Sequence, residues 1–388
     1  MGRYPDAAVE RAMKVQEVIT RAASGQLAWW QAAEILGVTD RHLRRLRDKW
    51  ETDGYDGLFD RRRQQPSPKR VPLGTLERVL QLYRTRYADF SVQHFHEKLT
   101  GEHGIALSYS WVKHALQTAG LVPRRRKRGP HRRRRERRPV PGMLLHLDAS
   151  RHAWVPGDAT LYDLVSVSDD ATNELYYAVL VAEENTREVL RALRAVVATH
   201  GVFCALYTDR ASHFIHTPPP GQPRHQTQVE RALQQLGIEL ICAHSPQARG
   251  RKERLYGTLQ GRWPQELRLR GVTTVAEANA WLQAEGIAAF NRRFAVPPAQ
   301  AGSAFVATTL DLERICTVQQ ERVVSQANTV QLGRRVLQIG PSRFRCHFVK
   351  CRVTVHEHLD GTLSITYGPH RLGRYTTEGQ PLASEAAA

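Results

Sequence analysis

Three carboxylates in the second half of the chain, Asp148, Asp209 and Glu253, have the types and positions of ligands for a hard divalent cation. Asp148 follows the apolar run 143–147, Asp209 follows the run 203–208, and Glu253 lies in the first turns of a predicted helix. If the two runs are neighbouring strands, the aspartates meet at one sheet edge and Glu253 reaches them from a packed helix. Oxygen ligands of this kind suit Mg²⁺ or Mn²⁺. Two such ions about 4 Å apart can activate an attacking oxygen and stabilise a leaving one.

Each of these acids has a structural alternative. An aspartate at the end of a strand is ordinarily a turn residue, so the three acids point to a metal site only as a set. Asp169 and Asp170 are expected to be acids of a hairpin turn rather than metal ligands. Glu266 competes with Glu253 as the third acid, but the cations around Glu253 favour it because they could hold phosphate groups. These cations are Arg251, Lys252 and Arg254.

The elements around the acids alternate between strands and helices from residue 139 onward. Apolar runs of strand length and amphipathic helical stripes follow one another in the order β-β-β-α-β-α-β-α. With acids after the first and fourth strands and on the last helix, this order is that of an α/β RNase H-like fold. The predicted strands are 143–148, 162–168, 175–182, 203–208 and 238–242, and the predicted helices are 186–200, 226–236 and the one that carries Glu253.

Positive charge is concentrated in the first third of the chain. The 388 residues carry a formal charge of +18. Residues 1–138 hold 30 Lys and Arg against 15 Asp and Glu, a net charge of +15, whereas residues 139–388 hold 26 against 23. This asymmetry indicates a polyanion-binding segment attached to a nearly neutral body.

Residues 31–46 have the pattern of a helix-turn-helix. A short helix, a tight turn at Gly37 and a second helix share an apolar face, while basic side chains point elsewhere. The second helix, residues 39–50, is the predicted DNA-recognition helix. An ordinary helical hairpin with a solvated basic face is the alternative. The residues predicted to contact DNA are Thr39, which also caps the helix, Arg41, His42, Arg44, Arg45 and Arg47.

A second helical unit and a dense basic run follow. Apolar positions over residues 74–121 resemble a second helix-turn-helix less clearly, with a plain helical spacer as the alternative. Residues 124–138 hold eleven Lys or Arg and one Glu, and repulsion at this charge density keeps a segment extended. We expect this run to lie along phosphates, with a solvated linker or a localisation-like run as the alternative. Its predicted DNA contacts are Arg124, Arg125, Arg126, Lys127, Arg128, Arg132, Arg133, Arg134 and Arg135.

The chain beyond residue 298 is rich in short apolar runs separated by turn residues, which predicts a small β-barrel. The five cysteines form no CxxC pair and favour a reducing compartment. Cys346, His347 and Cys351 could form a metal clip, but alternating strand residues explain them more simply. The start of the chain lacks the apolar region of a signal peptide, and apolar runs such as 176–182 are too short to span a bilayer. We expect a cytoplasmic, nucleoid-associated protein.

Several separated segments carry a family resemblance. LHLDAS, LYTDRASHF and HSPQARGRKERLYGTLQGR, which contain the three acids, resemble the signature segments of the retroviral-integrase-like DDE transposases of bacterial insertion sequences. QAAEILGVTDRHLRRL and NRRFAVPP are similar to the ISNCY type, and the likeness covers about residues 10–370. Two features depart from the pattern. Asp209 and Glu253 are 44 residues apart, stretched by a Pro-rich insertion at 217–228, and Arg210 and Ala211 stand where many relatives have Asn and Gly.

The resemblance implies a multidomain transposase that binds the terminal repeats of its element and catalyses metal-dependent strand cleavage and strand transfer. It implies that Asp148, Asp209 and Glu253 are catalytic and hold Mg²⁺ or Mn²⁺, with two ions in each active site. The implied partners are double-stranded DNA, both transposon ends and target, and other copies of the chain, at least a dimer. The expected domains are a helix-turn-helix domain at 1–60, a second helical DNA-binding domain at 73–123, a basic linker at 124–138, an RNase H-like catalytic core at 139–300 and a β-barrel at 305–375.

Two other functions remain open at this point. A transposase-derived regulator could bind the same DNA without cutting it, but such a protein gains nothing from three carboxylates placed near phosphates. An RNase H-like nuclease acting on RNA–DNA hybrids fits the predicted core. It does not account for a helix-turn-helix that reads DNA sequence.

Overall fold

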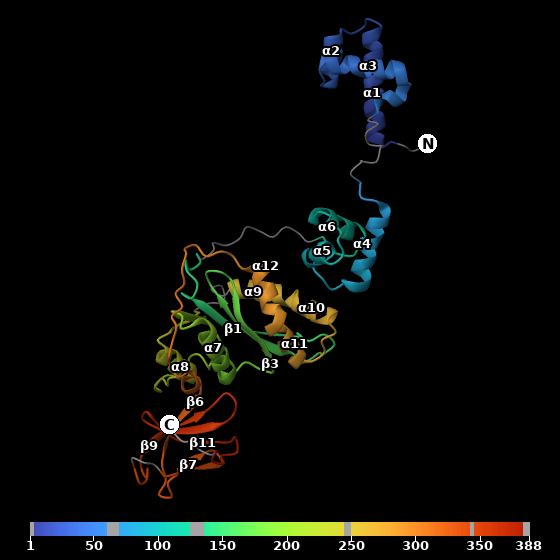
Figure 1. Ribbon diagram of the computed structural model, residues 1–388. Helices are drawn as coiled ribbons and strands as arrows, with labels where there is room; N and C mark the ends of the chain where they lie inside the picture. The colour runs from blue at the N-terminus through green and yellow to red at the C-terminus, as the bar shows by residue number, and fades with distance from the viewer. Residues whose placement is uncertain (1–3, 60–69, 125–135, 244–249, 342–344, 383–388) are drawn as a thin grey trace. The chain divides into compact units, whose positions relative to one another are not determined.

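The computed structural model describes residues 4–59, 70–124, 136–243, 250–341 and 345–382 (Figure 1). The chain separates into two compact units, residues 1–82 and 83–388, and each contains its own buried hydrophobic clusters. No helix within the described ranges is long and apolar enough to cross a membrane.

The first unit is built on three helices that share one small core. Ile19, Ala32 and Leu43, one from each helix, are fully buried in it. The chain turns between the second and third helices at Gly37, whose φ of 64° is a conformation that glycine adopts without strain. The predicted helix-turn-helix is therefore confirmed. The elements are α1 (Asp6–Ala23), α2 (Trp29–Leu36), α3 (Asp40–Asp53) and a 3-10 turn at Gly54–Leu58.

The predicted second helical unit is also present as helices, namely α4 (Leu73–Arg86), α5 (Val92–Gly101) and α6 (Tyr109–Thr118). Serine side chains cap the last two helices: Ser91 accepts the N–H of His94, and Ser108 accepts the N–H of Trp111. α5 and α6 pack against each other. The role of this helical unit in binding DNA stays a prediction.

The second unit contains a five-stranded mixed sheet in the order β3-β2-β1-β4-β5. The first three strands form an antiparallel meander, and β4 and β5 add to β1 in parallel. The β-β-β-α-β-α-β-α order predicted for an RNase H-like core is confirmed. The strands are β1 (Leu145–His152), β2 (Tyr162–Asp169), β3 (Leu175–Val181), β4 (Ala205–Thr208) and β5 (Glu239–Cys242).

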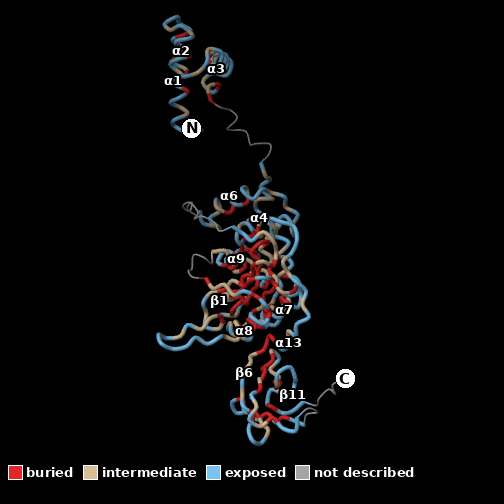
Figure 2. The backbone as a smooth tube through the Cα atoms, turned by 90° about the vertical axis from the view of Figure 1, so that its left-hand side faces the viewer, coloured by how far each residue is buried: buried red, intermediate tan, exposed pale blue. Residues whose placement is uncertain are grey.

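Helices cover both faces of this sheet (Figures 1 and 2). On one face, Leu147 and Val167 of the sheet pack against Leu193 of α7 (Thr186–His200) and Leu233 of α8 (Gln228–Leu236). The other face packs against a second cluster that includes Leu164 and Trp263. The helices of that face are α9 (Gly250–Gln260), α10 (Trp263–Leu269), α11 (Val275–Trp281) and α12 (Ile287–Phe294), with a π-helical turn at Leu282–Gly286.

The first strand differs from its predicted extent. We expected it to end at Asp148, but β1 continues to His152. The reason is its antiparallel partner, because β2 pairs with β1 over the whole length from Leu145 to His152. Asp148 therefore lies inside β1, just beyond the last residue pair that β1 makes with the shorter β4, His146 with Tyr207.

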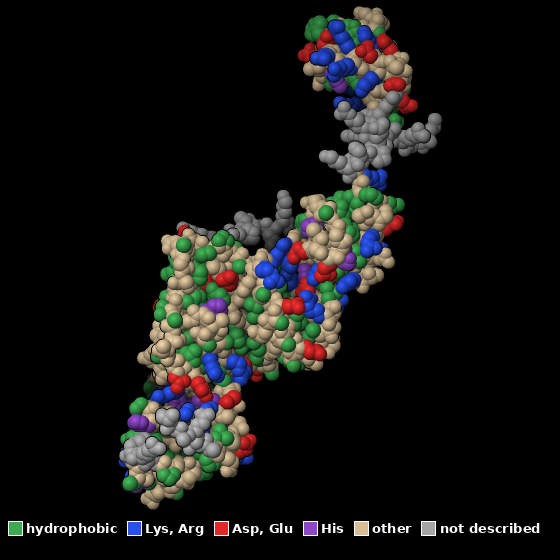
Figure 3. Space-filling model, in the orientation of Figure 1, with side chains coloured by type: hydrophobic (Ala, Val, Ile, Leu, Met, Phe, Trp, Pro, Cys, Tyr) green, Lys and Arg blue, Asp and Glu red, His purple; other side chains and the backbone are tan. Residues whose placement is uncertain are grey.

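Ion pairs join α5 to the helices of the core, and charged and histidine side chains gather there (Figure 3). Glu97 of α5 contacts Arg262 (2.8 Å) and Arg293 (2.6 Å). His94 and Lys98 both contact Glu266 of α10, at 2.7 and 2.8 Å. Burial alone would raise the pKa of Glu266, but the bonds from His94, Lys98 and Arg270 outweigh it and lower this pKa to about 2. Glu266, the alternative to Glu253 as the third acid, is thus held in this network of ion pairs.

The C-terminal part forms a four-stranded antiparallel sheet in the order β11-β10-β9-β6 and a separate two-stranded hairpin, β7-β8. The predicted closed barrel is not seen among the described residues. A barrel closes only when every strand has two hydrogen-bonded neighbours, and the ladders of β7 and β8 join them only to each other. The strands are β6 (Val318–Val323), β7 (Thr329–Leu332), β8 (Arg335–Gln338), β9 (Arg352–Glu357), β10 (Leu363–Tyr367) and β11 (His370–Tyr375).

A buried histidine lies where this sheet meets the short helix α13 (Leu312–Ile315). The ring nitrogens of His356 are 3.2 Å from the hydroxyl of Thr317 and 2.9 Å from that of Thr366. His356 is 2% exposed, and burial lowers its pKa to about 4. The neutral ring is therefore part of the folded sheet.

Candidate active site

The parallel pairing of two strands brings together the two segments that carry the predicted aspartates. Leu145 pairs with Leu206 and His146 with Tyr207, and Asp148 and Asp209 each lie two residues beyond this last pair. Alternation along β1 puts Asp148 on the face that α9 covers, opposite Leu147. Asp148 is only 8% exposed, and Asp209 is half-buried directly after β4.

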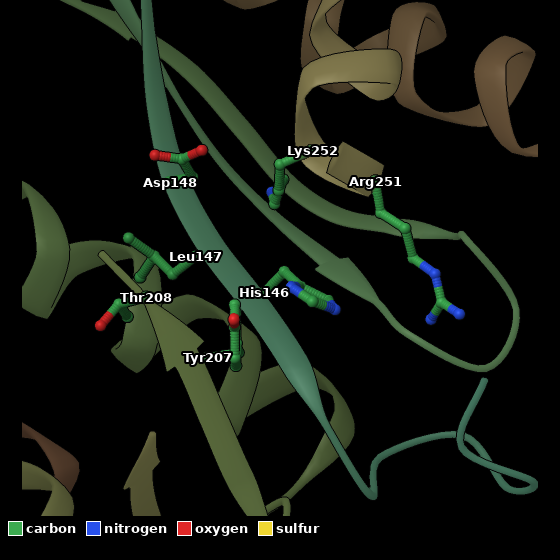
Figure 4. A pocket seen from close by; sticks show the side chains of 7 residues that line it. All are labelled: His146, Leu147, Asp148, Tyr207, Thr208, Arg251 and Lys252. Atoms are coloured by element: carbon green, nitrogen blue, oxygen red, sulfur yellow. The ribbon is translucent and has the colours of Figure 1, made fainter. Parts of the chain in front are cut away.

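A small cavity lies at this edge of the sheet (Figure 4). β1 contributes Asp148, β4 contributes Thr208, and the first turn of α9 contributes two cations. The cavity therefore brings a carboxylate of the expected triad together with cations expected to hold DNA. Its lining residues are His146, Leu147, Asp148, Tyr207, Thr208, Arg251 and Lys252.

Two side chains fix α9 to the sheet beside Asp148. The hydroxyl of Tyr256 donates to the backbone carbonyl of Asp148 and is 3.0 Å from the hydroxyl of Ser166. Lys252 is 4% exposed, and its Nζ donates to the carbonyl and the hydroxyl of Ser166, both at 3.1 Å. Lys252, predicted as a cation that holds DNA phosphates beside the acids, lies in the cavity wall because α9 turns this face toward the sheet, and its contact with DNA stays a prediction.

Glu253 occupies a different side of α9. Lys252 and Tyr256 are four residues apart and define the buried face, and the next residue after Lys252 is rotated from that face by about 100°. The Glu253 side chain is accordingly exposed and does not line the cavity. Within the described ranges, no group of three or more His, Cys, Asp and Glu side chains is placed to hold a metal ion. The donor set fits a divalent cation only in part, because Asp148 lines the cavity whereas Asp209 and Glu253 do not.

Asp170 ties three segments together at the edge of the cavity. Its carboxylate accepts hydrogen bonds from His146 (2.8 Å), from the backbone N–H of Arg138 (2.8 Å) and from Arg251. Burial alone would raise the pKa of Asp170, but these bonds outweigh it and hold this pKa well below its usual range. Asp170 thus stays ionised, consistent with its predicted place in the turn after β2.

Arginines crowd around this carboxylate. The guanidinium of Arg137 donates to the carbonyl oxygen of Asp170 at 2.9 Å. Its pKa is lowered by burial and by the charge of Arg251, and less so by that of Arg254, while the charge of Asp170 opposes this. Guanidinium groups this close together repel one another, so an anion such as phosphate stabilises the cluster when it binds.

The recognition helix presents most of its predicted contacts to solvent. Arg41, His42, Arg44 and Arg45 are exposed on α3. Arg47 is partly covered, since it donates to Asp48 (2.7 Å) and its guanidinium lies over the ring of Trp29. The hydroxyl of Thr39 accepts the backbone N–H of His42 (3.3 Å), which confirms the predicted helix cap.

Most of the predicted basic run falls outside the described residues. Arg124 is described and exposed, and so is Arg254 on α9. The predicted contacts that lie outside the described residues are Arg125, Arg126, Lys127, Arg128, Arg132, Arg133, Arg134 and Arg135. These stay predictions.

The sequence reasoning missed the contact between His146 and Asp170. One signal could have indicated it, because His146 lies two residues before Asp148 and therefore on the same face of a strand. The buried role of Lys252 gave no such signal. A lysine between two arginines has the pattern of a solvated basic face.

Comparisons with known proteins agree with the helix-turn-helix and identify the family of the chain. A helix-turn-helix domain family matches residues 16–67. "Putative transposase y4bF" of Sinorhizobium fredii (strain NBRC 101917 / NGR234) is 30% identical over 367 residues, which cover 94% of this chain and 80% of that protein. The chain therefore belongs to the transposase family.

A second relative indicates the kind of transposase. "Transposase for insertion sequence IS1202" of Streptococcus pneumoniae is 27% identical over 315 residues, covering 71% of this chain and 67% of that protein. The resemblance to insertion-sequence transposases seen in the sequence is thus confirmed. Among solved structures, the HTLV-2 integrase catalytic core domain in complex with magnesium (trimeric form) is 14% identical, covers 37% of this chain and 85% of its own, and has a TM-score of 0.29. A likeness at that score identifies neither the fold nor the function.

Proposed function

We propose that this transposase binds the terminal repeats of an insertion sequence and cleaves and joins DNA strands at the edge of the β1–β4 sheet. The observation that supports the proposal is the parallel pairing of β1 with β4, whose register, continued by two residues, would set Asp148 beside Asp209. Two carboxylates at adjacent strand positions repel each other unless a cation or a shared proton lies between them. In a transposase, this pairing is the best candidate for the catalytic centre.

We infer that Asp148 and Asp209 hold Mg²⁺ or Mn²⁺, because carboxylate oxygens are the ligands that these ions prefer. An ion bound there would polarise the phosphodiester and activate the attacking oxygen. Glu253 becomes a third ligand only if the first turn of α9 changes its orientation. The two aspartates are therefore the better-supported part of the proposed triad.

The other residues bind and orient DNA. The exposed arginines of α3 contact an element end, with the α4–α6 helices as a second DNA-binding unit. Arg251 and Arg254, at the start of α9, contact phosphates beside the cavity. In the proposed reaction a water nicks the strand to release a 3′-OH, and this hydroxyl attacks the target phosphodiester without a covalent protein intermediate. At least two copies of the chain pair the two ends.

A cleavage assay with a matched control tests this function. The full-length protein is incubated with labelled DNA carrying the ends of its own element, in Mg²⁺ and separately in Mn²⁺. The variant is Asp209→Asn, and the control is Asp163→Asn, since Asp163 is a buried carboxylate of β2 that accepts the backbone N–H of Glu184 (2.8 Å) and lies outside the proposed triad. We expect metal-dependent nicking and joining by wild type and control.

In Asp209→Asn, cleavage should fall by at least about a thousandfold while end binding persists, because a carboxylate that stabilises developing charge is lost. If the wild-type protein binds the ends but cuts in neither metal, the protein is a DNA-binding regulator. If Asp209→Asn cuts as fast as wild type, the active site lies elsewhere.

A further inference from the structure

Asp170 is buried in the turn that follows β2, although it is charged. Its side chain is fully buried, and its backbone N–H donates to the carbonyl of Leu144 (3.0 Å), directly before β1. A buried carboxylate is costly unless its oxygens are well bonded. The bonds that meet this cost come from three separate parts of the chain, so Asp170 determines how those parts lie relative to one another.

Two of the partners of Asp170 line the cavity. Oδ1 accepts from Nε2 of His146 and from the guanidinium of Arg251, and both of these residues belong to the cavity wall beside Asp148. Oδ2 accepts from the backbone of Arg138, at the end of the basic run. One carboxylate therefore links β1, the first turn of α9 and the chain that enters the core from residues 124–138.

The first turn of α9 depends on this link. Residues 244–249, which precede it, lie outside the described residues, and its described ties to the sheet include Arg251 with Asp170 and Lys252 with Ser166. Glu253 follows these two residues directly, so the direction of its side chain depends on where Arg251 is held. A shift of about 1 Å in such a turn is enough to change a reaction rate by about a hundredfold.

The charges around Asp170 are unbalanced. Arg137 interacts electrostatically with Arg251 and Arg254 as well as with Asp170 and Asp169, so three arginines share two aspartates here. Asp170 contacts Nη1 of Arg251, whose side chain is 24% exposed. A guanidinium held in this way can donate to phosphodiester oxygens with little loss of freedom.

We propose that Asp170 is a positioning residue, which aims Arg251 at a phosphodiester of the strand to be cut and holds the first turn of α9 against β1. The proposal rests on the function proposed above and adds to it the residue that organises the phosphate contact. Arg137 belongs, with Arg251, to the group of arginines that binds this phosphate. Asp170 acts through Arg251 and touches neither the substrate nor the reacting atoms.

A double-mutant cycle tests the proposal, using Asp170→Asn, Arg251→Gln and the two together in the full-length protein. The readouts are the single-turnover cleavage rate and, separately, the dissociation constant for end DNA. We expect each single variant to lower the rate by about 10- to 100-fold with a change of less than about threefold in end affinity. The double variant should be no slower than the slower single variant, because both changes break one interaction.

Two controls separate positioning from general damage. Arg251→Lys keeps the charge but not the forked geometry, and it should recover part of the rate lost in Arg251→Gln. Asp163→Asn removes a buried carboxylate elsewhere on β2 and should lower the thermal midpoint without slowing cleavage. If Asp170→Asn fails to fold, Arg251→Gln decides alone, since its side chain is partly exposed: a wild-type rate overturns the proposal. If the fold-loss of rate in the double variant equals the product of the two single-variant losses, the two residues act independently, and this result also overturns the proposal.

The cleavage assay separates failure of the Asp170 proposal from failure of the proposed function. If wild type cleaves and Asp209→Asn does not, the function stands, and the Asp170 cycle is read by itself. If wild type does not cleave at all, the function fails. The Asp170 proposal, which concerns the strand to be cut, then fails with it, whereas a cleaving wild type with independent effects of the two changes overturns the Asp170 proposal alone.

Discussion

At the scale of single residues, neighbouring arginines on one helix have different tasks. Arg45 is exposed on α3, whereas Arg47 is bound to Asp48 and lies over Trp29. We expect Arg45→Ala to weaken binding of element-end DNA roughly tenfold and to lower the slope of log affinity against log salt by about one, because a phosphate contact and its released counterion are lost. Arg47→Ala should change both quantities less. Fluorescence anisotropy over a salt series measures them.

The thermal midpoints of the two variants serve as the control. Arg47→Ala removes exposed ion pairs on the helix surface, which contribute little to stability, so both proteins should unfold close to wild type. An equal loss of affinity in the two variants would contradict the assignment.

The same scale shows where sequence reasoning about the site succeeds and where it stops. Asp148 and Asp209 can be found because each follows an apolar run, and the sheet then places the runs side by side. The direction of Glu253 cannot be found in this way. It depends on which residue of α9 faces Ser166, and packing between residues that are 86 positions apart in the chain decides this. The importance of Asp170 is hidden for the same reason, because its partners come from three segments.

At the scale of elements, the C-terminal sheet should respond to mild acid. The pKa of His356 is lowered to about 4 in the folded protein, below its ordinary value of 6.5. The unfolded chain therefore binds the proton more readily, so stability is fully present above about pH 6.5 and is lost as the pH falls toward 4. The shift corresponds to a loss on the order of 3 kcal/mol. We expect His356→Gln to reduce this loss, measured by urea unfolding at pH 7.5 and pH 5.

His358, a second buried histidine in the same sheet, provides a comparison. Burial lowers its pKa as well, so His356→Gln should remove only part of the pH dependence. An unchanged dependence in His356→Gln would show that other groups control the acid response.

Elements also differ in how far the sequence predicts them. The α/β order of the core follows from apolar runs and amphipathic stripes, which local burial determines. The end of β1 does not follow from these patterns, because the pairing of β1 with β2 extends past Asp148. The predicted barrel is not seen among the described residues for a related reason. Alternating apolar residues predict strands, but which strand pairs with which is decided by contacts far apart in the chain.

At the scale of the whole molecule, the two compact units predict separable activities. We expect a fragment of residues 70–388 to keep a cooperative thermal transition, because the sheet and both of its covering helical layers lie within it. The fragment should lose most of its preference for element ends over scrambled DNA, since it lacks the helix-turn-helix. Differential scanning calorimetry and competition binding check the two parts. Undiminished preference would assign sequence reading to α4–α6.

The ion pairs of α5 with α10 and Arg293 bear on the distance between a DNA contact made by the helices and the proposed active site. Glu97, His94 and Lys98 fasten α5 to the helices that cover the sheet carrying Asp148, and α6 is packed on α5. If α6 contacts the duplex as proposed, these ion pairs hold that contact at a set distance from Asp148. The number of base pairs between the recognised sequence and the bond that is cut would then be set by the protein, so the spacing of side chains would define the length of the element as much as the base sequence of its ends does.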